Sequence, residues 1–362
     1  MSKKKQLGQF FTTNYVYILQ NLHIPDYVKV VVEPFCGNGD LLKFLPSGIT
    51  TECYDIDPKK SSIVKQDTLL NPVNLSGKFL LTNPPYLARN KSQDKTLFDK
   101  YACNDLYKCF IKILLTNKPL GGILIIPLNF WSSIRVSDIK LRKKFLSVYD
   151  VMKLNIFEER VFCDTSYTVC SFQFIQKQSL HNKLDIMIYP SKKRILTTMN
   201  STNNYIIGGE IYKLIQNKNI NISRLTRLNK KSPYITNILL KCIDDNKSKK
   251  ISLQYVKNEK RFIDKTPNLS ARTYATLCIE PQLSVSDQKE LIARFNTFLN
   301  CWRKKYNSLF LTNYRESKDI SRKRISFKLA YQIVSHLLLD FAEEDSEEDS
   351  EEDSEDTTDT EE

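Results

Sequence analysis

Short apolar runs alternate with mixed polar and apolar segments between residues 28 and 176. Between some of these runs, residues 40–45 and 105–118 have the apolar spacing of amphipathic helices. Strands that alternate with helices predict a mostly parallel sheet covered on both faces, with the last two strands as an antiparallel edge. The runs that predict strands are VKVVVEP (28–34), TTECYDID (50–57), GKFLLTNPP (77–85), GGILIIPLNF (121–130), DVMKLNIF (150–157) and YTVCSFQFI (167–175).

The alternation weakens from about residue 180 onward, where Asn, Ser and Lys dominate and glycine is sparse. Two stretches of this part, 286–305 and 325–341, have helix-like spacing. The last residues repeat Ser, Asp and Glu and cannot bury a core, so they predict a disordered acidic tail. The sequence therefore predicts an α/β domain over 1–180, a smaller domain over 181–342 and a tail over 343–362.

The charge of the chain is divided between the tail and the rest. Residues 343–362 hold 14 of the 41 acidic residues and none of the 54 basic ones, so residues 1–342 carry +27 where the whole chain carries +13. Such a basic body attracts polyanions, with nucleic acid as the first candidate, although ribosome binding fits the charge equally well.

Composition excludes several classes of protein. The 9 cysteines contain no CxxC pair and the chain has only 3 histidines, so we expect neither a zinc site nor a disulfide framework, and the lack of disulfides favours a reducing, intracellular location. No run approaches the roughly 20 apolar residues of a membrane span. No apolar run follows the basic N-terminus, so we expect no secretory signal.

The first candidate site is the segment VVEPFCGNGD, residues 31–40. A strand that runs into a glycine turn exposes backbone N–H groups to a ligand, and Gly37 and Gly39 allow a close approach. The P-loop lysine and the third Rossmann glycine are both missing, which argues against a phosphate ligand. A plain strand-to-helix turn, with glycines only for tightness, is the alternative.

Two carboxylates follow this turn at the ends of the next strands. Asp55 lies where it can accept hydrogen bonds from ribose hydroxyls, and Asp67 where it can accept from an adenine amino group. A nucleoside cofactor without a bound phosphate fits this set, and S-adenosylmethionine is the obvious example. Asp55 considered alone is better explained as a solvated carboxylate at a strand end.

The second candidate site is TNPPYL, residues 82–87, at the end of a fourth predicted strand on the same edge of the sheet. Prolines fix the backbone, so the Pro84 carbonyl and the Asn83 side-chain oxygen can both be aimed at the two hydrogens of an amino group. Tyr86 offers a π face to a planar ring. The alternative is a rigid turn with a surface tyrosine.

These motifs resemble those of amino-group DNA methyltransferases that make N6-methyladenine, in the gamma arrangement of viral and bacterial restriction-modification enzymes. LGQFFTT (7–13) resembles the motif that closes over the cofactor, EPFCGNGD the cofactor loop and YDIDP the ribose motif. QDTLL resembles the adenine-contacting motif, TNPPYL the catalytic tetrapeptide, and DLYKCFIKI and 161–174 the later motifs. The resemblance covers residues 6–176, and the ending 309–334 also resembles some members.

The resemblance implies a Rossmann-like fold, S-adenosylmethionine as the methyl donor, and transfer to N6 of an adenine flipped out of double-stranded DNA. It implies catalytic roles for Asn83, Pro84, Pro85 and Tyr86, and stacking of the flipped base on Tyr86 with Phe162 or Tyr167 as the second aromatic. It implies cofactor binding by Gln9, Phe10, Phe11, Thr12, Glu33, Phe35, Gly37, Gly39, Asp55, Ile56, Asp67, Thr68, Asn83 and Phe110.

The same tetrapeptide serves other acceptors, so RNA bases and protein glutamine remain alternatives, as does a DNA-binding protein on a catalytically dead fold. Basic runs of the C-terminal region, such as 224–231 and 302–306, with interleaved tyrosines such as Tyr255, predict target recognition there. For any one run a solvated face is the better explanation, and for any one tyrosine it is core packing in a small domain. No nuclease motif is evident, so any restriction endonuclease partner is a separate chain. No membrane or metal partner is expected.

Overall fold

The computed structural model of the chain describes residues 7–162, 167–180, 182–245, 248, 250–265, 273–316 and 321–339. The chain divides into two compact units. The first comprises the residues up to Ile207 together with Thr312–Ser321, and the second comprises Gly208–Leu311 and the residues from Arg322 on. The predicted acidic tail, 343–362, lies outside the described residues.

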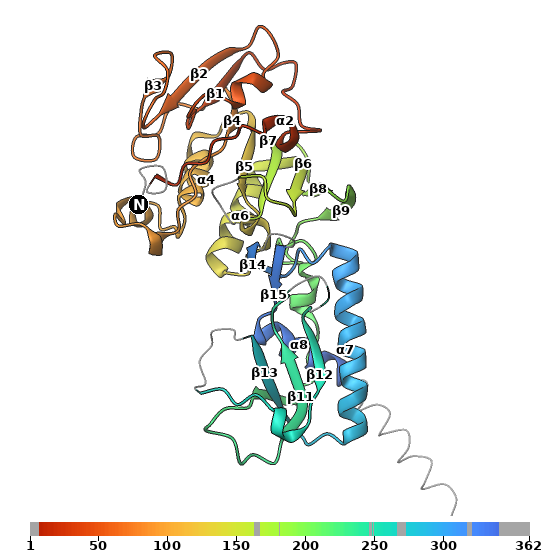
Figure 1. The fold of residues 1–362 in the computed structure, drawn as a ribbon. Helices are drawn as coiled ribbons and strands as arrows, with labels where there is room; N and C mark the ends of the chain where they lie inside the picture. Colours follow the sequence, from red (N-terminus) through yellow and green to blue (C-terminus); the bar gives the residue numbers. More distant parts are fainter. Residues whose placement is uncertain are drawn as a thin grey trace, which may run out of the picture. The chain divides into compact units, whose positions relative to one another are not determined.

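The first unit contains a nine-stranded sheet in the order β3-β2-β1-β4-β5-β7-β6-β8-β9 (Figure 1). The strand pairs from β3 to β5 are all parallel, and so is β6 with β8. The predicted α/β class with a mostly parallel sheet is therefore confirmed. The strands are β1 (Val30–Glu33), β2 (Thr50–Asp55), β3 (Val64–Lys65), β4 (Phe79–Thr82), β5 (Gly121–Pro127), β6 (Tyr149–Phe157), β7 (Val169–Gln176), β8 (Lys183–Tyr189) and β9 (Lys193–Thr198).

The far side of this sheet differs from the sequence prediction. β6 and β7 are antiparallel, as expected, but they do not form the edge, because β8 and β9 continue the sheet beyond them. Along KLDIMIY of β8, buried residues alternate with less buried ones, which is the period of a half-buried strand. The first unit thus continues past residue 180, where the sequence placed the end of the first domain.

Of the two helices that the sequence predicts in the first unit, one forms an α-helix. Residues 106–117 form α4, but residues 41–44 form only a single 3-10 turn, because Pro46 holds the preceding Leu45 in an extended conformation (φ −75°, ψ 137°). The helices are α2 (Tyr15–Ile18), η1 (Leu41–Phe44), η2 (Arg89–Lys91), α3 (Thr96–Lys100), α4 (Leu106–Asn117), α5 (Asn129–Ser132) and α6 (Val136–Val148).

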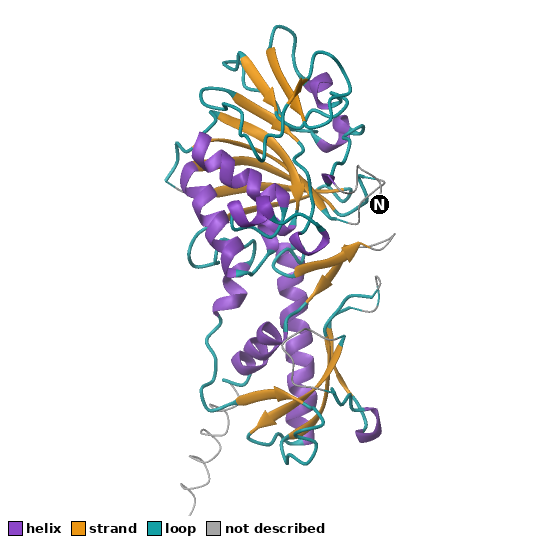
Figure 2. Ribbon diagram, turned by 90° about the vertical axis from the view of Figure 1, so that its left-hand side faces the viewer, coloured by secondary structure: helices purple, strands orange, loops and turns teal. Residues whose placement is uncertain are grey.

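Both faces of the central strands are buried, which explains their continuous apolar runs. Phe79 and Leu81 of β4 belong to a core cluster that includes Ile18 of α2. On β7, Phe172 and Phe174 instead contact aromatic rings of the α5 and α6 region, such as Phe145 at 6.0 and 5.4 Å between centroids. Successive residues of a strand point to opposite faces, so each run supplies two cores. Figure 2 shows helices alongside the strands of this sheet.

Within the described residues, the second unit contains a four-stranded antiparallel sheet, two α-helices and two short 3-10 helices. The longer helix, α7, begins with a capping box between Ser284 and Asp287 and contacts β11 and β12. Its position confirms the predicted helix at 286–305, and α8 lies within the predicted stretch 325–341. The elements are η3 (Gly209–Lys213), β10 (Asn221–Arg224), β11 (Ile235–Lys241), β12 (Ser252–Tyr255), η4 (Asn258–Lys260), β13 (Tyr274–Glu280), α7 (Val285–Tyr306) and α8 (Phe327–Leu337), with β14 (Thr312–Glu316) and β15 (Ser321–Arg324) near the division.

Within the described ranges, none of the helices has both the length and the apolar content that a membrane crossing requires.

Candidate active site

The candidate site lies where three neighbouring parallel strands end. β1 pairs in parallel with both β2 and β4, so the segments that follow Glu33, Asp55 and Thr82 leave the sheet at one edge. This is the edge at which open α/β sheets bind ligands. The sequence motifs FCGNG, YDID and TNPPYL are therefore brought together by the strand order.

The glycine turn after β1 contacts the N-terminal segment. Gly37 has φ of +54°, a conformation that favours glycine, and a Cβ there would lie 2.9 Å from the Phe11 ring. Gly39 also has positive φ, at +75°, but it does not line the cavity described below. Gly37 thus combines a required backbone conformation with a close approach of an aromatic ring.

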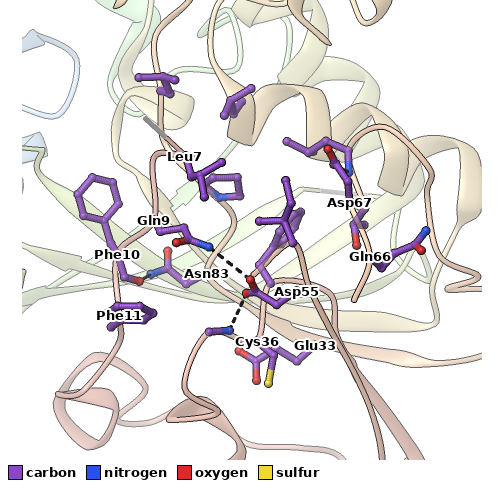
Figure 3. Close-up of a pocket in the computed structure, with 18 of the residues that line it drawn as sticks. Leu7, Gln9, Phe10, Phe11, Glu33, Cys36, Asp55, Gln66, Asp67 and Asn83 are labelled. Atoms are coloured by element: carbon purple, nitrogen blue, oxygen red, sulfur yellow. Dashed lines mark hydrogen bonds between the residues drawn. The ribbon is translucent and has the colours of Figure 1, made fainter. Parts of the chain in front are cut away.

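Asp55 holds the glycine turn in place. Its Oδ2 accepts a hydrogen bond from the Gly37 backbone N–H at 2.8 Å, and its Oδ1 accepts from the Asp57 N–H at 2.8 Å. The Gln9 amide also donates to Oδ1, at 3.4 Å (Figure 3). The side chain is buried, and both of its oxygens accept backbone hydrogen bonds. A role in positioning the turn therefore accompanies the predicted role toward a ribose.

Glu33 presents a buried carboxylate oxygen to the same region. The residue is 1% exposed, and Oε2 has no hydrogen-bond partner within the described residues. Burial raises the pKa of the Glu33 carboxyl well above its usual value. A buried acceptor without a partner is costly, and a ligand that supplies N–H or O–H donors, or a positive charge, would remove that cost.

An open cavity of about 280 Å³ lies between these groups. Asp67 and Thr68 line it, and the Asp67 Oδ1 accepts from the backbone N–H groups of Leu69 and Leu70, which fixes the turn. Predicted residues that line the cavity are Gln9, Phe10, Phe11, Thr12, Glu33, Phe35, Gly37, Asp55, Ile56, Asp67, Thr68, Asn83 and Pro85. Predicted residues that do not line it are Gly39, Pro84, Tyr86, Phe110, Phe162 and Tyr167.

Phe110 lies one side chain away from the cavity. It is fully buried in α4 and makes an edge-to-face contact with Phe35, with ring centroids 4.9 Å apart. Phe35 is the ring that reaches the cavity. Phe110 supports that ring, and a direct contact with a cofactor adenine remains a prediction.

The N-terminal segment is bound to the turn that follows β4. The Tyr86 backbone N–H donates to the Gly8 carbonyl at 2.9 Å, and Gly8 has φ of +65°. A Cβ at Gly8 would lie 2.7 Å from the Tyr86 carbonyl oxygen. The two motifs GQFFT and NPPY, far apart in the sequence, therefore form one substructure.

Asn83 is oriented by this substructure. Its Nδ2 donates to the Phe10 carbonyl oxygen at 2.8 Å and to the Thr12 hydroxyl at 3.0 Å. Because a carbonyl oxygen can only accept, the amide must turn its nitrogen toward Phe10 and its oxygen away. Asn83 is 8% exposed and is one of the residues that line the cavity, so a residue with a held acceptor oxygen forms part of the cavity wall.

Tyr86 is buried, in contrast to the surface tyrosine of the alternative interpretation. It is 2% exposed, and its hydroxyl lies within hydrogen-bonding distance of the Asn83 Oδ1 and the Ile125 carbonyl oxygen, the latter at 2.7 Å. Burial raises the pKa of the Tyr86 phenol well above its usual value. The hydroxyl therefore keeps its proton at neutral pH and donates it to one of these two acceptors.

The two candidates for the second stacking aromatic occupy different positions. Tyr167 makes an edge-to-face contact with Tyr86, at 6.3 Å between ring centroids and 86° between planes. Phe162 contacts Phe10 instead, at 6.2 Å and 37°. Phe10 in turn stacks on Tyr86 at 5.2 Å and 29°. Which of the two serves an acceptor ring remains a prediction.

Sequence reasoning missed the cavity residues between TNPPYL and α4. Ser92 and Asp94 of the connecting loop and Leu97 and Phe98 of α3 all line the cavity. The sequence signal was weak, because KSQDKTLFDK contains a single apolar pair in a charged segment. Phe98 is 2% exposed, so this apolar pair covers the cavity from the α3 side.

Asp105, at the start of α4, should make stability depend on pH. Its Oδ1 accepts from the Leu87 N–H at 3.1 Å, and burial raises the pKa of its carboxyl to about 6. The folded state therefore holds this proton more tightly than the unfolded state, so the contribution of Asp105 to stability falls as pH rises from about 4 through 6. We expect Asp105→Asn to remove up to about 3 kcal/mol of this pH dependence. Urea denaturation at pH 4 and pH 8 measures the free energy of unfolding, and an equal change between the two pH values in both proteins would contradict the prediction.

Part of the basic character of the second unit stabilises its own fold. Arg303 donates two hydrogen bonds to Asp244, at 3.0 and 2.6 Å, and Arg224 pairs with Asp264 at 3.4 Å. These arginines belong to basic runs that the sequence predicts to contact DNA, at 302–306 and 224–231. Both are largely buried, which makes them poor phosphate ligands. Among the tyrosines between the basic runs, Tyr255 is 41% exposed, so core packing does not explain this residue.

Comparisons with known proteins identify similar folds only. No family model matches the chain, and no curated protein matches its sequence. A modification subunit of a putative type I restriction enzyme from Vibrio vulnificus is 11% identical, with a TM-score of 0.37, over 52% of this chain and 49% of that one. A type I restriction-modification methyltransferase subunit from Streptococcus thermophilus is 13% identical, with a TM-score of 0.37, over 52% and 51%.

A third similar structure is a putative class I S-adenosylmethionine-dependent methyltransferase from Listeria monocytogenes. It is 13% identical, with a TM-score of 0.35, over 48% of this chain and 61% of that one. The chain thus spans about half the length of the first two structures and less than two thirds of the third.

Proposed function

We propose that the chain is a DNA methyltransferase that transfers a methyl group from S-adenosylmethionine to N6 of an adenine flipped out of double-stranded DNA. The observation that carries the proposal is the orientation of Asn83. Its amide nitrogen is held by Phe10 and Thr12, so its oxygen is a fixed acceptor on a residue that lines the cavity. An acceptor of this kind suits an amino group.

The cavity fits S-adenosylmethionine by the chemistry of its donors and acceptors. The Glu33 Oε2, buried and without a partner within the described residues, suits the positively charged amino group of a methionine moiety. The aromatic ring of Phe35 and the side chain of Ile56 suit an adenine ring, and Asp67 lies beside them as an acceptor. S-adenosylmethionine would supply an electrophilic methyl group on a positively charged sulfur.

Asn83 and Pro84 would prepare the acceptor nitrogen. Its lone pair is delocalised into the adenine ring, so the nitrogen is a poor nucleophile. Hydrogen bonds from its two N–H groups to the Asn83 Oδ1 and the Pro84 carbonyl would draw it toward sp³ geometry, with the lone pair directed at the methyl group. The nitrogen would form its new bond to the methyl carbon as the carbon–sulfur bond breaks, the bonding pair would stay on the sulfur, and the proton would then pass from the nitrogen to solvent.

The Tyr86 hydroxyl would make room for this arrangement without moving far. It has a second acceptor, the Ile125 carbonyl oxygen at 2.7 Å. When an amino group approaches the Asn83 Oδ1, the hydroxyl can donate to Ile125 alone. The Asn83 oxygen then has a lone pair for the substrate, and no buried donor is left without a partner.

The basic region over 181–342 would bind DNA and select the site. Exposed cations give affinity through phosphate contacts, and a few polar side chains in the groove give sequence choice. The target base cannot react within a duplex and must leave the stack. Because its motifs resemble those of restriction-modification enzymes, the chain would act in a restriction-modification system. The restriction endonuclease would then be a separate chain.

The test is an assay for the methylated product. The protein is incubated with methyl-labelled S-adenosylmethionine and unmethylated double-stranded DNA, and the DNA is digested to nucleosides for mass spectrometry. The expected product is N6-methyl-2′-deoxyadenosine. Sequencing that detects methylated bases would identify the target site. Label in RNA or in protein glutamine, but not in DNA, would favour the alternative acceptors. Calorimetry that detects no S-adenosylmethionine binding would favour a catalytically dead DNA-binding protein.

A further inference from the structure

The Tyr86 ring has no face open to a ligand. It is 2% exposed, it stacks on Phe10 at 5.2 Å and 29°, and it makes edge-to-face contacts with Tyr107 and Tyr167 at 6.2 and 6.3 Å between ring centroids. The proposed function requires an acceptor ring on Tyr86, close enough for its amino group to reach Asn83. An acceptor ring cannot reach that place while the Phe10 ring occupies it.

The Phe10 ring lies between two of the aromatic residues assigned to the acceptor. It is nearly parallel to Tyr86, at 29°, and is tilted by 37° against Phe162, with centroids 5.2 and 6.2 Å away. The contact with Tyr86 is a stacked one, of the kind that a planar base makes with an aromatic side chain, and the contact with Phe162 is tilted. When no base is bound, the phenyl ring of Phe10 thus supplies an aromatic contact to both Tyr86 and Phe162.

We propose that Phe10 occupies the acceptor subsite as an internal substitute for the planar base, and that the base displaces the Phe10 ring when it binds. Phe10 thereby controls acceptor selection, because only a ring that stacks better than a phenyl ring can replace it. The inference rests on the proposed function for the identity of the acceptor, and on the two ring contacts for the subsite itself.

The backbone around Phe10 allows the ring to move alone. The Phe10 carbonyl oxygen accepts from the Asn83 Nδ2 at 2.8 Å, and the neighbouring Gly8 carbonyl accepts from the Tyr86 N–H at 2.9 Å. Rotation about the side-chain bonds of Phe10 would leave both hydrogen bonds intact. Asn83 therefore stays oriented for the amino group while the ring leaves the subsite.

The experiment measures binding of 2-aminopurine, a fluorescent isomer of adenine whose emission is quenched when it stacks. The full-length protein is first saturated with S-adenosylhomocysteine, so that the cofactor cavity is filled. Phe10→Ala removes the internal competitor, and the loss of two aromatic contacts predicts about tenfold tighter 2-aminopurine binding than in the wild type. Combining it with Tyr86→Ala is expected to abolish that gain.

Controls separate this effect from general loosening. Phe10→Leu keeps apolar volume without a flat ring and is expected to bind the probe with intermediate affinity. Phe44→Ala removes a phenylalanine that packs on the same core cluster, and Phe44 is not among the ring partners of Tyr86 or Phe162 in the described part of the chain. It should leave probe affinity unchanged. Thermal unfolding checks that each variant is folded.

The proposal is overturned if folded Phe10→Ala and Phe10→Leu bind 2-aminopurine no more tightly than the wild type, or if neither binds it at about 1 mM. Its failure is distinguishable from failure of the proposed function. Methylation of DNA without any gain in Phe10→Ala would refute only the role of Phe10. A gain without methylation of any acceptor would retain the subsite and refute the proposed reaction.

Discussion

Replacing Asn83 with alanine is expected to lower methyl transfer by about 100- to 1000-fold while S-adenosylmethionine affinity stays within about threefold of the wild type. The amide oxygen is the acceptor that the Phe10 and Thr12 contacts hold in place, so its loss removes an interaction that strengthens as the nitrogen becomes pyramidal. The measurements are single-turnover methylation of DNA and calorimetric titration of the cofactor.

Two further variants make the Asn83 result specific. Thr12→Val removes one of the two acceptors that orient the amide and keeps the Phe10 carbonyl, so we expect a smaller loss of about tenfold. Asn74→Ala removes an exposed asparagine that accepts from the Ser76 N–H in a turn before β4, and it should not change the rate. Full activity in Asn83→Ala would refute the proposed mechanism.

The second large effect is expected from Asp55→Asn, which should weaken S-adenosylmethionine binding by about 10- to 100-fold. Both oxygens of Asp55 accept backbone hydrogen bonds, from Gly37 and from Asp57. An amide presents an N–H group to one of these donors, and about 1.5–3 kcal/mol of a charge-assisted hydrogen bond is lost. The glycine turn then no longer holds the conformation in which it faces the cavity. Calorimetry at neutral pH measures the affinity.

The neighbouring Asp57 is the matched control. It is paired with Lys59 at 2.6 Å on a more exposed surface, so Asp57→Asn removes the same charge two residues away. Its cofactor affinity should stay close to that of the wild type, since surface ion pairs contribute little. Equal weakening in the two variants would show that charge in this loop, and not support of the Gly37 turn, determines cofactor binding.

The central strands of the sheet were predictable because they are buried on both faces. Runs such as GGILIIPLNF are continuous apolar sequence, and every run of this kind formed a strand in the structure. β8 and β9 were missed because KLDIMIY and KRILTT mix lysine and threonine with apolar residues in a region that looked like a different domain. Residues 41–44 had helical spacing, but Pro46 limited them to one turn.

The site was partly predictable for a related reason. Glycines, a carboxylate and the NPPY tetrapeptide mark the ends of strands, and parallel neighbours bring strand ends together whatever the loops between them do. The contribution of α3 was not predictable, because only the tertiary structure shows that Leu97 and Phe98 line a cavity.

The sequence by itself determined the class of fold, the edge of the sheet that carries the site and the residue types found there, because these depend on apolar periodicity and on short motifs. Only the tertiary structure decided which groups are accessible and which are already bonded. It placed Phe10 on Tyr86, gave the Asn83 nitrogen its two acceptors and turned Asp55 toward the glycine turn. Such contacts join residues more than seventy positions apart, or lie across neighbouring strands, and packing rather than local sequence sets them.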